Sequence, residues 1–405
     1  MNIFLKDTDK IYTYGQLLDH INQSEEYCPE FQGKDLFNYF TNLLIGLSGG
    51  EDIFLIDADF SKEEVNALGL SGINKKTHLE KRIFNDLDDL IHAIRESTSR
   101  ITIFTSGTTG QPKKVTHSYA SLSRAVRRGD KYSGNIWGFA YNPTHMAGLQ
   151  VFFQALENKN ELVNIFNQSR ISIYASIREN NITHISATPT FYRLLLPVED
   201  SFHSVRRITL GGEKSGESLY RAIHQIFPEA KITNVYASTE AGTLFASKGS
   251  DFIFPKDNLK DFKVIDGELY IHKSLLGESD SLKLDGDFYP TGDLIEWVNE
   301  AEGLFRFKSR KNELINVGGY KVNPQDVEDA IRDISGISDV QVFGKANSVL
   351  GNVLCAKVVK EYNSDITEPD IKKQLSVRLQ DFKIPRIIRF VDSIDVTRTG
   401  KLKRL

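Results

Sequence analysis

The chain has 405 residues, enough for a large hydrophobic core, and we expect two or three domains rather than one. Its composition, 40% hydrophobic and 26% charged, is that of a soluble globular protein. Fifty Lys and Arg against 54 Asp and Glu give a formal net charge of -4, which excludes a general attraction for nucleic acid or an anionic membrane.

The sequence predicts a cytoplasmic protein. No apolar run approaches the roughly 18 residues that a membrane helix needs, and the N-terminal stretch lacks the apolar core of a signal peptide. The two cysteines, Cys28 and Cys355, lie far apart and form neither a metal motif nor a disulfide framework, which suits a reducing compartment.

From about residue 50, apolar runs typical of strands alternate with helical stretches. Predicted strands cover residues 52–56, 101–104, 136–141, 162–165, 182–186, 207–210 and 231–236. Helices are predicted over 118–128, 171–180 and 215–227, and another begins at Ser61, which has Glu64 at capping-box spacing. This alternation predicts an α/β fold with mainly parallel sheets covered by helices, whose ligands bind at the carboxyl ends of strands.

After about residue 260 the pattern becomes that of a small α+β unit. Hairpins are predicted around Asp266-Gly267 and around Gly318-Gly319, and a helix follows Asn323-Pro324. Further predicted elements are strands over 304–308, 340–343, 353–358 and 387–391 and a helix over 371–380. We place a boundary near residues 309–312, which divides the chain into a large domain (1–309) with a short N-terminal part and a small domain (310–405).

The loop TSGTTGQPK, residues 105–113, directly follows a predicted strand. Its two glycines allow backbone N–H groups to converge on an anion, its hydroxyls add donors, and Lys113 adds charge. The loop is not a P-loop, because Gly110 is followed by Gln111 rather than by Lys. A solvated Ser/Gly/Thr loop is the alternative to a phosphate site.

TSGTTGQPK resembles the phosphate-loop signature of the acyl-adenylate-forming (AMP-binding) superfamily, which contains acyl- and aryl-CoA ligases, nonribosomal peptide adenylation domains and firefly luciferase. Later stretches resemble its other motifs in the expected order: NVYASTEAG (234–242), FYPTGDL (288–294), FKSRKNELINVGGYKVNP (307–324) and TRTGKLKR (397–404). The resemblance runs from about residue 100 to the end, and before that only TYGQL (13–17) resembles a family feature.

This resemblance implies a reaction in two halves. A carboxylate attacks the α-phosphorus of Mg²⁺-bound ATP and expels pyrophosphate, and the thiol of CoA or of a carrier-protein phosphopantetheine then attacks the acyl-adenylate. The implied catalytic residues are Lys113, Thr239, Glu240, which also holds Mg²⁺, and Lys401. The implied ATP-binding residues are Thr105, Ser106, Gly107, Thr108, Thr109, Gly110, Gly211, Gly212, Asn234, Tyr236, Asp293 and Arg310.

Several of these residues would be structural if they stood alone. A Tyr after a strand is usually in the core, a Glu in a loop is usually solvated, and Lys401 could belong to a frayed basic tail. The ordered motifs favour the functional interpretation. In the family the small domain rotates about a hinge, here Asn312 where Asp or Lys is usual, and Gly318 and Gly319 then line the thiol tunnel.

The sequence gives less information about the acid substrate than about the nucleotide. Residues 141–156 resemble the P-x-x-H-x-x-G-L pattern of acyl- and aryl-CoA ligases and contain no acid to pair the ammonium of an amino acid. A carboxylic acid without an amino group is therefore favoured, as in 2-succinylbenzoate–CoA ligases. The implied acyl pocket contains His145, Thr188, Ala237, which replaces the usual Gly, and Ser238, although a satisfied core histidine is the alternative for His145.

Two other functions stay open. A stand-alone adenylation enzyme would load the acid onto a carrier protein. A pseudoenzyme would bind the nucleotide without catalysing a reaction. The expected partners are thus a small carboxylic acid and either CoA or a carrier protein, with no nucleic acid and no membrane, and a homodimer is left open.

Overall fold

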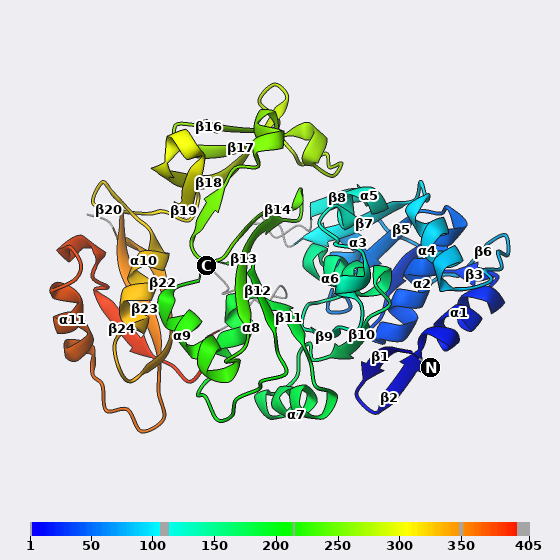
Figure 1. Ribbon diagram of the computed structural model, residues 1–405. Helices are drawn as coiled ribbons and strands as arrows, with labels where there is room; N and C mark the ends of the chain where they lie inside the picture. Colours follow the sequence, from blue (N-terminus) through cyan, green and yellow to red (C-terminus); the bar gives the residue numbers. More distant parts are fainter. Residues whose placement is uncertain (1, 106–112, 214, 348–350, 395–405) are drawn as a thin grey trace. The chain divides into compact units, whose positions relative to one another are not determined.

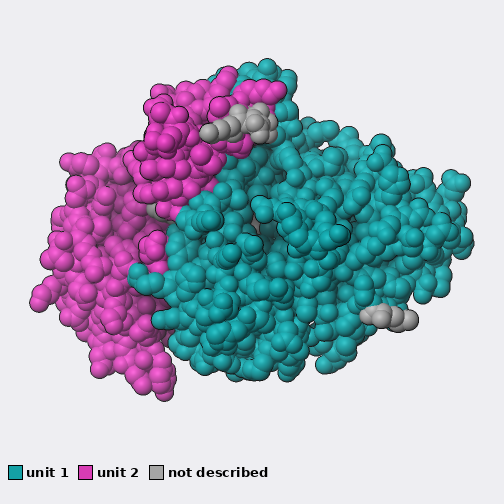
Figure 2. Space-filling model, viewed as in Figure 1, with its two compact units in different colours: residues 1–215, 219–249, 272–289 teal, residues 216–218, 250–271, 290–405 magenta. Residues whose placement is uncertain are grey.

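The computed structural model describes residues 2–105, 113–213, 215–347 and 351–394. The chain divides into two compact units, coloured separately in Figure 2: residues 1–215, 219–249 and 272–289 form unit 1, and residues 216–218, 250–271 and 290–405 form unit 2. The boundary predicted between residues 309 and 310 stays a prediction. Within the described residues, no helix combines the length and apolar character needed to cross a membrane.

The main sheet of unit 1 has eight strands in the order β14-β13-β12-β11-β9-β10-β1-β2 (Figure 1). Neighbours from β13 to β1 run parallel, and the edge strands β14 and β2 pair antiparallel, so the predicted α/β fold with a mainly parallel sheet is confirmed. The strands are β1 (Ile3–Asp7), β2 (Lys10–Thr13), β9 (Ile136–Phe139), β10 (Glu161–Asn164), β11 (His184–Ala187), β12 (Arg207–Gly211), β13 (Lys231–Ser238) and β14 (Gly242–Ser247).

A second sheet of unit 1 carries the phosphate-loop motif. Its order is β4 (Glu30–Gln32), β5 (Ile53–Ile56), β7 (Arg100–Thr105) and β8 (Lys113–Ser118), with β8 antiparallel to β7. A short pair, β3 (Glu26–Tyr27) and β6 (Thr77–His78), completes the strands of this region. The predicted strands at residues 52–56 and 101–104 are thereby found in neighbouring positions of one sheet.

Helices connect and cover the strands of unit 1. They are α1 (Tyr14–Gln23), α2 (Leu36–Gly49), α3 (Lys62–Ala67), α4 (Leu87–Arg95), α5 (Tyr119–Ser123), α6 (Met146–Glu157), α7 (Arg170–Asn180), α8 (Pro189–Arg193) and α9 (Glu217–Ile226), the last of which starts within residues assigned to unit 2. The predicted capping box of Ser61 and Glu64 is present at the start of α3.

The helix predicted over residues 118–128 is too long. It begins after the N-cap Ser118 as expected, but α5 ends at Ser123. The reason is that the backbone of Arg127 makes hydrogen bonds with side chains that do not belong to α5. Its N–H donates to Gln154, and its carbonyl accepts from Gln154 and Asn158. Gln154 of α6 and Asn158, the C-cap residue of that helix, thus replace the helical hydrogen bonds that would have continued α5.

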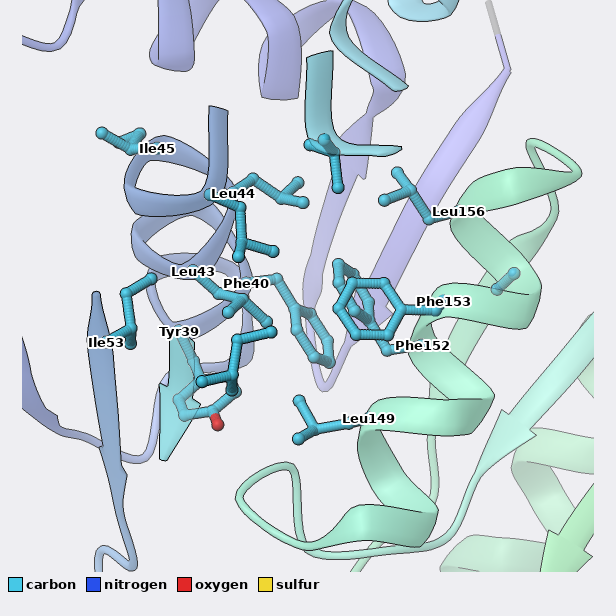
Figure 3. Packing of buried hydrophobic residues seen from close by; sticks show 14 of the residues in the cluster. Tyr39, Phe40, Leu43, Leu44, Ile45, Ile53, Leu149, Phe152, Phe153 and Leu156 are labelled. Atoms are coloured by element: carbon cyan, nitrogen blue, oxygen red, sulfur yellow. The ribbon is translucent and has the colours of Figure 1, made fainter. Parts of the chain in front are cut away.

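The packing of α2 against α6 forms the centre of the largest core of unit 1 (Figure 3). Phe40 and Phe152 stack with ring centroids 4.0 Å apart and an interplanar angle of 4°, and both side chains are fully buried. Asp35 caps the first turn of α2, and Gly50 ends the helix in the left-handed conformation that glycine adopts without strain. This core supports the helix whose N-cap is His145.

Unit 2 contains two sheets. The first, in the order β15-β19-β18-β17-β16, consists of β15 (Asp251–Ile253), β16 (Phe262–Ile265), β17 (Glu268–His272), β18 (Phe288–Asn299) and β19 (Leu304–Arg310). The second consists of β20 (Ile315–Val317), β21 (Tyr320–Val322), β22 (Ile337–Asn347), β23 (Gly351–Lys360) and β24 (Ile387–Phe390), with helices α10 (Pro324–Arg332) and α11 (Glu368–Ser376). Both predicted hairpins are present, and all four turn residues, Asp266, Gly267, Gly318 and Gly319, have positive φ.

Candidate active site

The phosphate-loop motif is flanked by two paired strands of unit 1. Strands β7 and β8 pair antiparallel, and their last pair, Thr105 with Lys113, flanks the loop. Lys113 is half-buried. The predicted contacts of Ser106, Gly107, Thr108, Thr109 and Gly110 lie outside the described residues. The described part therefore fixes where the loop leaves and re-enters the sheet.

Thr239 and Glu240 form the turn between β13 and β14, at the carboxyl end of the strand next to the edge strand β14 of the main sheet. Three successive carbonyls of this turn accept hydrogen bonds from elsewhere in unit 1. The carbonyl of Thr239 accepts from His117 at 2.8 Å, that of Glu240 from the Gly277 N–H at 2.7 Å, and that of Ala241 from Arg124. The backbone of the turn is thus held along its whole length, and the side chains of Thr239 and Glu240 stay half-buried.

His117 belongs to β8, the strand that follows the phosphate loop, and its ring is 2% exposed. Its Nε2 faces the Thr239 carbonyl, which only accepts, so this nitrogen carries the proton. Its Nδ1 lies 2.9 Å from Ser121 Oγ and accepts from that hydroxyl when the ring is neutral. Burial lowers the pKa of His117, which favours the neutral ring.

The segment that contains Gly277 and Glu278 pairs with the same strand. The backbones of Glu278 and Thr116 exchange two hydrogen bonds of 2.8 Å. Gly277 lies against the imidazole of His117, where an added Cβ would come within 2.5 Å of the ring. Glycine is therefore required at position 277 for this ring position, and β8, the turn and this segment form one hydrogen-bonded assembly.

Asn234, predicted to contact adenine, is buried in a network within unit 1. Its amide nitrogen donates to Tyr220 Oη and to the Gly249 carbonyl at 2.9 Å, and its oxygen accepts from Ser215 Oγ at 3.0 Å. Both amide hydrogens are engaged in this structure. The side-chain carbonyl oxygen has a second lone pair, which is the acceptor for the adenine N6 amino group in the assigned role, and that role stays a prediction.

Backbone packing and conformation restrict which residues fit at the carboxyl ends of β12 and β13. Gly211 ends β12, and an added Cβ would lie 2.8 Å from Val235 of the adjacent strand, whereas Gly212 needs a positive φ of 83°. Tyr236 lies 5.8 Å from the Phe245 ring. Between Tyr236 and Ala237 the pairing with β14 shifts register. Ala237 keeps a negative φ there, so the chain tolerates Ala where the family usually has Gly.

On the predicted acyl side, His145 occupies the N-cap position of α6 without a side-chain capping hydrogen bond, and its Nε2 lies 3.5 Å from Asp57 Oδ2. Asp57 also accepts from Asn142 Nδ2 at 3.0 Å. Gly148 lets this loop approach the helix, because an added Cβ would meet the Asn142 carbonyl at 2.3 Å. Close packing against the Asn142 carbonyl therefore explains the glycine of the P-x-x-H-x-x-G pattern.

Thr188 and Ser238, the other predicted pocket residues, both make local hydrogen bonds. Thr188 is the N-cap of α8 and accepts from the Phe191 N–H, while Ser238 accepts from the Ala241 N–H at 3.1 Å. Both positions lie at the carboxyl ends of parallel strands, β11 and β13, where ligands of such sheets bind. Their contact with an acyl group stays a prediction.

In unit 2, Asp293 and Arg310 face each other on β18 and β19, and Arg310 Nε donates to Asp293 Oδ1 at 2.9 Å. Thr291 and Gly292 are held as well: the Thr291 hydroxyl donates to the Leu269 carbonyl, and the Gly292 N–H donates to the buried carboxylate of Glu268. The TGD motif is therefore part of a long strand, and Asp293 is a pre-oriented acceptor.

The predicted thiol-tunnel glycines form the tip of the β20–β21 hairpin, where the Gly319 N–H donates to Asn316. Gly318 and Tyr320 border a cavity of about 180 Å³ within unit 2. Asn312, the predicted hinge, is exposed in the turn after β19. Lys401 lies outside the described residues, and its assignment rests on the sequence motif.

Sequence reasoning missed His117 and Asp57. Asp57 directly follows a predicted strand, and the rule that ligands gather at carboxyl ends of strands would have selected it. His117 gives no such signal, because three consecutive residues of β8, Val115 to His117, are buried without alternation.

Comparisons with known proteins agree with this arrangement. The family model described as AMP-binding enzyme matches residues 54–263, more than half of the chain, and the model for the AMP-binding enzyme C-terminal domain matches residues 326–401. The chain belongs to the AMP-binding enzyme family.

Two relatives illustrate the range of that family. 2-Succinylbenzoate–CoA ligase from Staphylococcus aureus is 26% identical over 425 residues, which cover 94% of this chain and 82% of the relative. Bacitracin synthase 3 from Bacillus licheniformis is 25% identical over 403 residues, which cover 86% of this chain and 6% of that much longer protein. The chain similarly spans only 8% of gramicidin S synthase 2 from Brevibacillus brevis.

Solved structures share the fold at low identity. The o-succinylbenzoate CoA synthetase of Bacillus subtilis in complex with its acyl-adenylate intermediate has a TM-score of 0.72 at 19% identity, covering 99% of this chain and 94% of that one. The same synthetase in complex with ATP and a magnesium ion aligns with a TM-score of 0.72 at 18% identity, covering 99% and 95%.

Proposed function

We propose that the protein is an ATP-dependent ligase that joins a carboxylic acid to a thiol through an acyl-adenylate. The observation that carries this proposal is the 2.8 Å hydrogen bond between His117 and Thr239, since it brings the strand after the phosphate loop into contact with the Thr239–Glu240 turn. His117 and Thr239 are 122 residues apart in sequence, and their contact joins the strand after one motif to the turn of another that would serve the same triphosphate.

The first half-reaction gathers negative charge on the α-phosphate and on the departing pyrophosphate, so positioned cations and N–H donors supply most of the catalysis. We assign Lys113 and the loop 105–110 to the β- and γ-phosphates and the Thr239 hydroxyl to the α-phosphate. Lys401 would bridge the substrate carboxylate and the α-phosphate. The half-buried Glu240 carboxylate fits Mg²⁺, which prefers one carboxylate together with phosphate oxygens and water, and the ion neutralises phosphate charge when bound.

We assign the nucleoside contacts residue by residue. Asp293 can accept hydrogen bonds from both ribose hydroxyls through its two oxygens, and its pairing with Arg310 fixes its orientation. Tyr236 would stack on adenine beside Gly211 and Gly212, and Asn234 would contact its N6 edge.

The second half-reaction transfers the acyl group to a thiol, and we propose CoA as the acceptor. Gly318 and Gly319 would let a pantetheine arm pass close to backbone, with Asn312 as the hinge. The similarity to a CoA ligase over 82% of that relative supports this choice. Similarity to peptide synthases over 6–8% of their length keeps transfer to a carrier protein as the second candidate.

The acid would enter beside His145, Thr188, Ala237 and Ser238. Because Asp57, the carboxylate nearest to His145 among the described contacts, is already paired with Asn142 and His145, it is not assigned to a substrate ammonium. We therefore propose an acyl or aryl acid without an α-amino group, of the 2-succinylbenzoate type.

Exchange of labelled pyrophosphate into ATP, screened over aryl, fatty and dicarboxylic acids, tests adenylation. At least one acid should support exchange, and Glu240→Ala should weaken the use of Mg-ATP. Failure of every acid would favour the nucleotide-binding pseudoenzyme. Thioester formation with free CoA, against the mass shift of an added carrier protein, then separates the two ligase alternatives.

Lys401→Ala separates the two half-reactions. This variant should lose adenylation and keep thioester formation from a preformed acyl-adenylate, because the lysine is assigned only to the first transition state. Equal loss in both assays would contradict its assignment to one half-reaction.

A further inference from the structure

We propose that His117 is a positioning residue that sets the Thr239–Glu240 turn for Mg-ATP. This inference rests on the proposed function and extends it to a side chain outside the family motifs quoted above. His117 is not assigned a contact with the nucleotide. It acts through the backbone of the turn whose side chains are assigned to the α-phosphate and to Mg²⁺.

The first argument is the pattern of donors around the turn. Thr239, Glu240 and Ala241 present three consecutive carbonyls, and each is bound by a different part of unit 1: His117 of β8, the Gly277 N–H, and Arg124 just after α5. A turn at the end of a strand is normally solvated, and its peptide planes can then rotate. Here all three planes are fixed, which also fixes the directions in which the Thr239 and Glu240 side chains leave the backbone.

The second argument is the fit of an imidazole to the position. The ring bridges two partners on opposite edges, Ser121 Oγ at 2.9 Å and the Thr239 carbonyl at 2.8 Å. It is 2% exposed, and Gly277 lies so close to the ring that any side chain there would displace it. The ring is therefore built into a tight site, so it links the phosphate-loop strand to the turn as one rigid assembly.

Two substitutions of His117 separate its two hydrogen bonds. In His117→Gln the side-chain amide nitrogen can occupy the place of Nε2 and still donate to the Thr239 carbonyl. In His117→Asn the shorter amide reaches only the place of Nδ1 and loses that carbonyl. Loss of one well-aligned hydrogen bond at this turn should weaken Mg-ATP binding about tenfold in His117→Asn, while His117→Gln should stay within about threefold of the parent.

Calorimetry on the full chain measures the effect without turnover. The dissociation constants of ATP with Mg²⁺, ATP with EDTA and adenosine are compared for the parent and both variants. The expected result is a selective loss of Mg-ATP affinity in His117→Asn with adenosine affinity unchanged, because adenosine lacks the α-phosphate assigned to Thr239, and recovery in His117→Gln. A folded His117→Asn with parental Mg-ATP affinity, or an equal loss for adenosine and Mg-ATP, would overturn the proposal.

Gly277→Ala tests the same assembly without changing His117. The added methyl would meet the imidazole at 2.5 Å, whereas the Gly277 N–H to Glu240 is kept, so this variant should reproduce the selective loss even if His117→Asn does not fold. The matched control is Gly216→Ala, because an added Cβ there meets nothing within 4 Å and Gly216 has no positive φ. Parental Mg-ATP affinity in a folded Gly277→Ala would count against the proposal.

Failure of the proposed function looks different. In that case the parent chain itself would support no pyrophosphate exchange with any acid, whether or not it binds Mg-ATP. A parent that binds Mg-ATP with variants that bind it equally well would overturn only the role of His117.

Discussion

The imidazole of His145 lies 3.5 Å from the carboxylate of Asp57, although the two residues follow strands of different sheets. Asp57 is 3% exposed and accepts from Asn142 and from the Asp59 N–H. Burial raises the pKa of Asp57, but the contacts with His145, the Asp59 N–H and Asn142 outweigh it and keep the pKa below its usual value. Asp57 is therefore a carboxylate at neutral pH and orients the histidine of the proposed acyl pocket.

Asp57→Asn should impair use of the acid and leave use of ATP unchanged. The amide keeps the shape but removes the charge that faces His145, so we expect the KM for the acid to rise about tenfold, the effect of losing about 1.4 kcal/mol. Steady-state kinetics with each substrate varied separately gives the result. Asp59→Asn, an exposed change on the same loop, is the control, and an altered ATP KM with an unchanged acid KM would contradict the assignment.

Asp293→Asn should weaken ATP binding and the preference for a ribose. Because one carboxylate is assigned to both ribose hydroxyls, the parent should prefer ATP to 2′-deoxy-ATP, and the variant should lose most of that preference. The ratio of kcat/KM for the two nucleotides is the measurement. Asp251→Asn removes a carboxylate paired with Arg306 in the same sheet and should keep the ratio. An unchanged ratio in Asp293→Asn would remove the residue from the ribose site.

Local signals predicted much of the fold. The buried strand β5, IFLI, is a short apolar run, and the hairpin turn Asp266-Gly267 has φ values of 50° and 78°, which Asp and Gly adopt most readily. By contrast, α2 was not predicted. It is buried on nearly all sides, so its sequence LFNYFTNLLIGLSG has no polar face to mark a helical period.

The sequence predicted the site residues that lie in family motifs, but not the residues that contact them from distant parts of the sequence. The family resemblance selected Thr239 and Glu240, but His117 is 122 residues away from Thr239, and its contact depends on how two sheets meet. Similarly, Gly292 lies within β18, and the pairing of β18 with β19 places Asp293 opposite Arg310. The register that places two such residues opposite each other is a property of the whole sheet, so a local motif does not predict it.

A buried charge network supplies a pH-dependent part of the stability. The Glu157 side chain is fully buried and is bonded by Arg95, Arg128 and Tyr119. Burial raises the pKa of Glu157, but these hydrogen bonds outweigh burial and lower it to about 2. Since the folded pKa lies below the unfolded value of about 4.3, the network stabilises the fold above that pH, and this contribution is lost as pH falls toward 2.

Glu157→Gln should therefore destabilise the protein at pH 7, by about 3 kcal/mol from this pKa difference, and by less at pH 3. Urea unfolding of both proteins at the two pH values measures the change. Glu199→Gln breaks the exposed pair with Arg170 and should cost less than about 1 kcal/mol at either pH. A loss in Glu157→Gln that does not depend on pH would exclude the charge as its source.

The stacked pair Phe40 and Phe152 should be among the most sensitive positions of unit 1. Phe152→Ala removes a fully buried ring between α2 and α6, and such truncations cost about 3–5 kcal/mol because the surrounding core closes the cavity only in part. Ile171→Ala on α7 is the matched control, since that side chain is 76% exposed and its truncation should change stability by less than about 0.5 kcal/mol. Chemical unfolding of the two variants measures the difference, and equal losses would mean that the α2–α6 contact does not hold the core together.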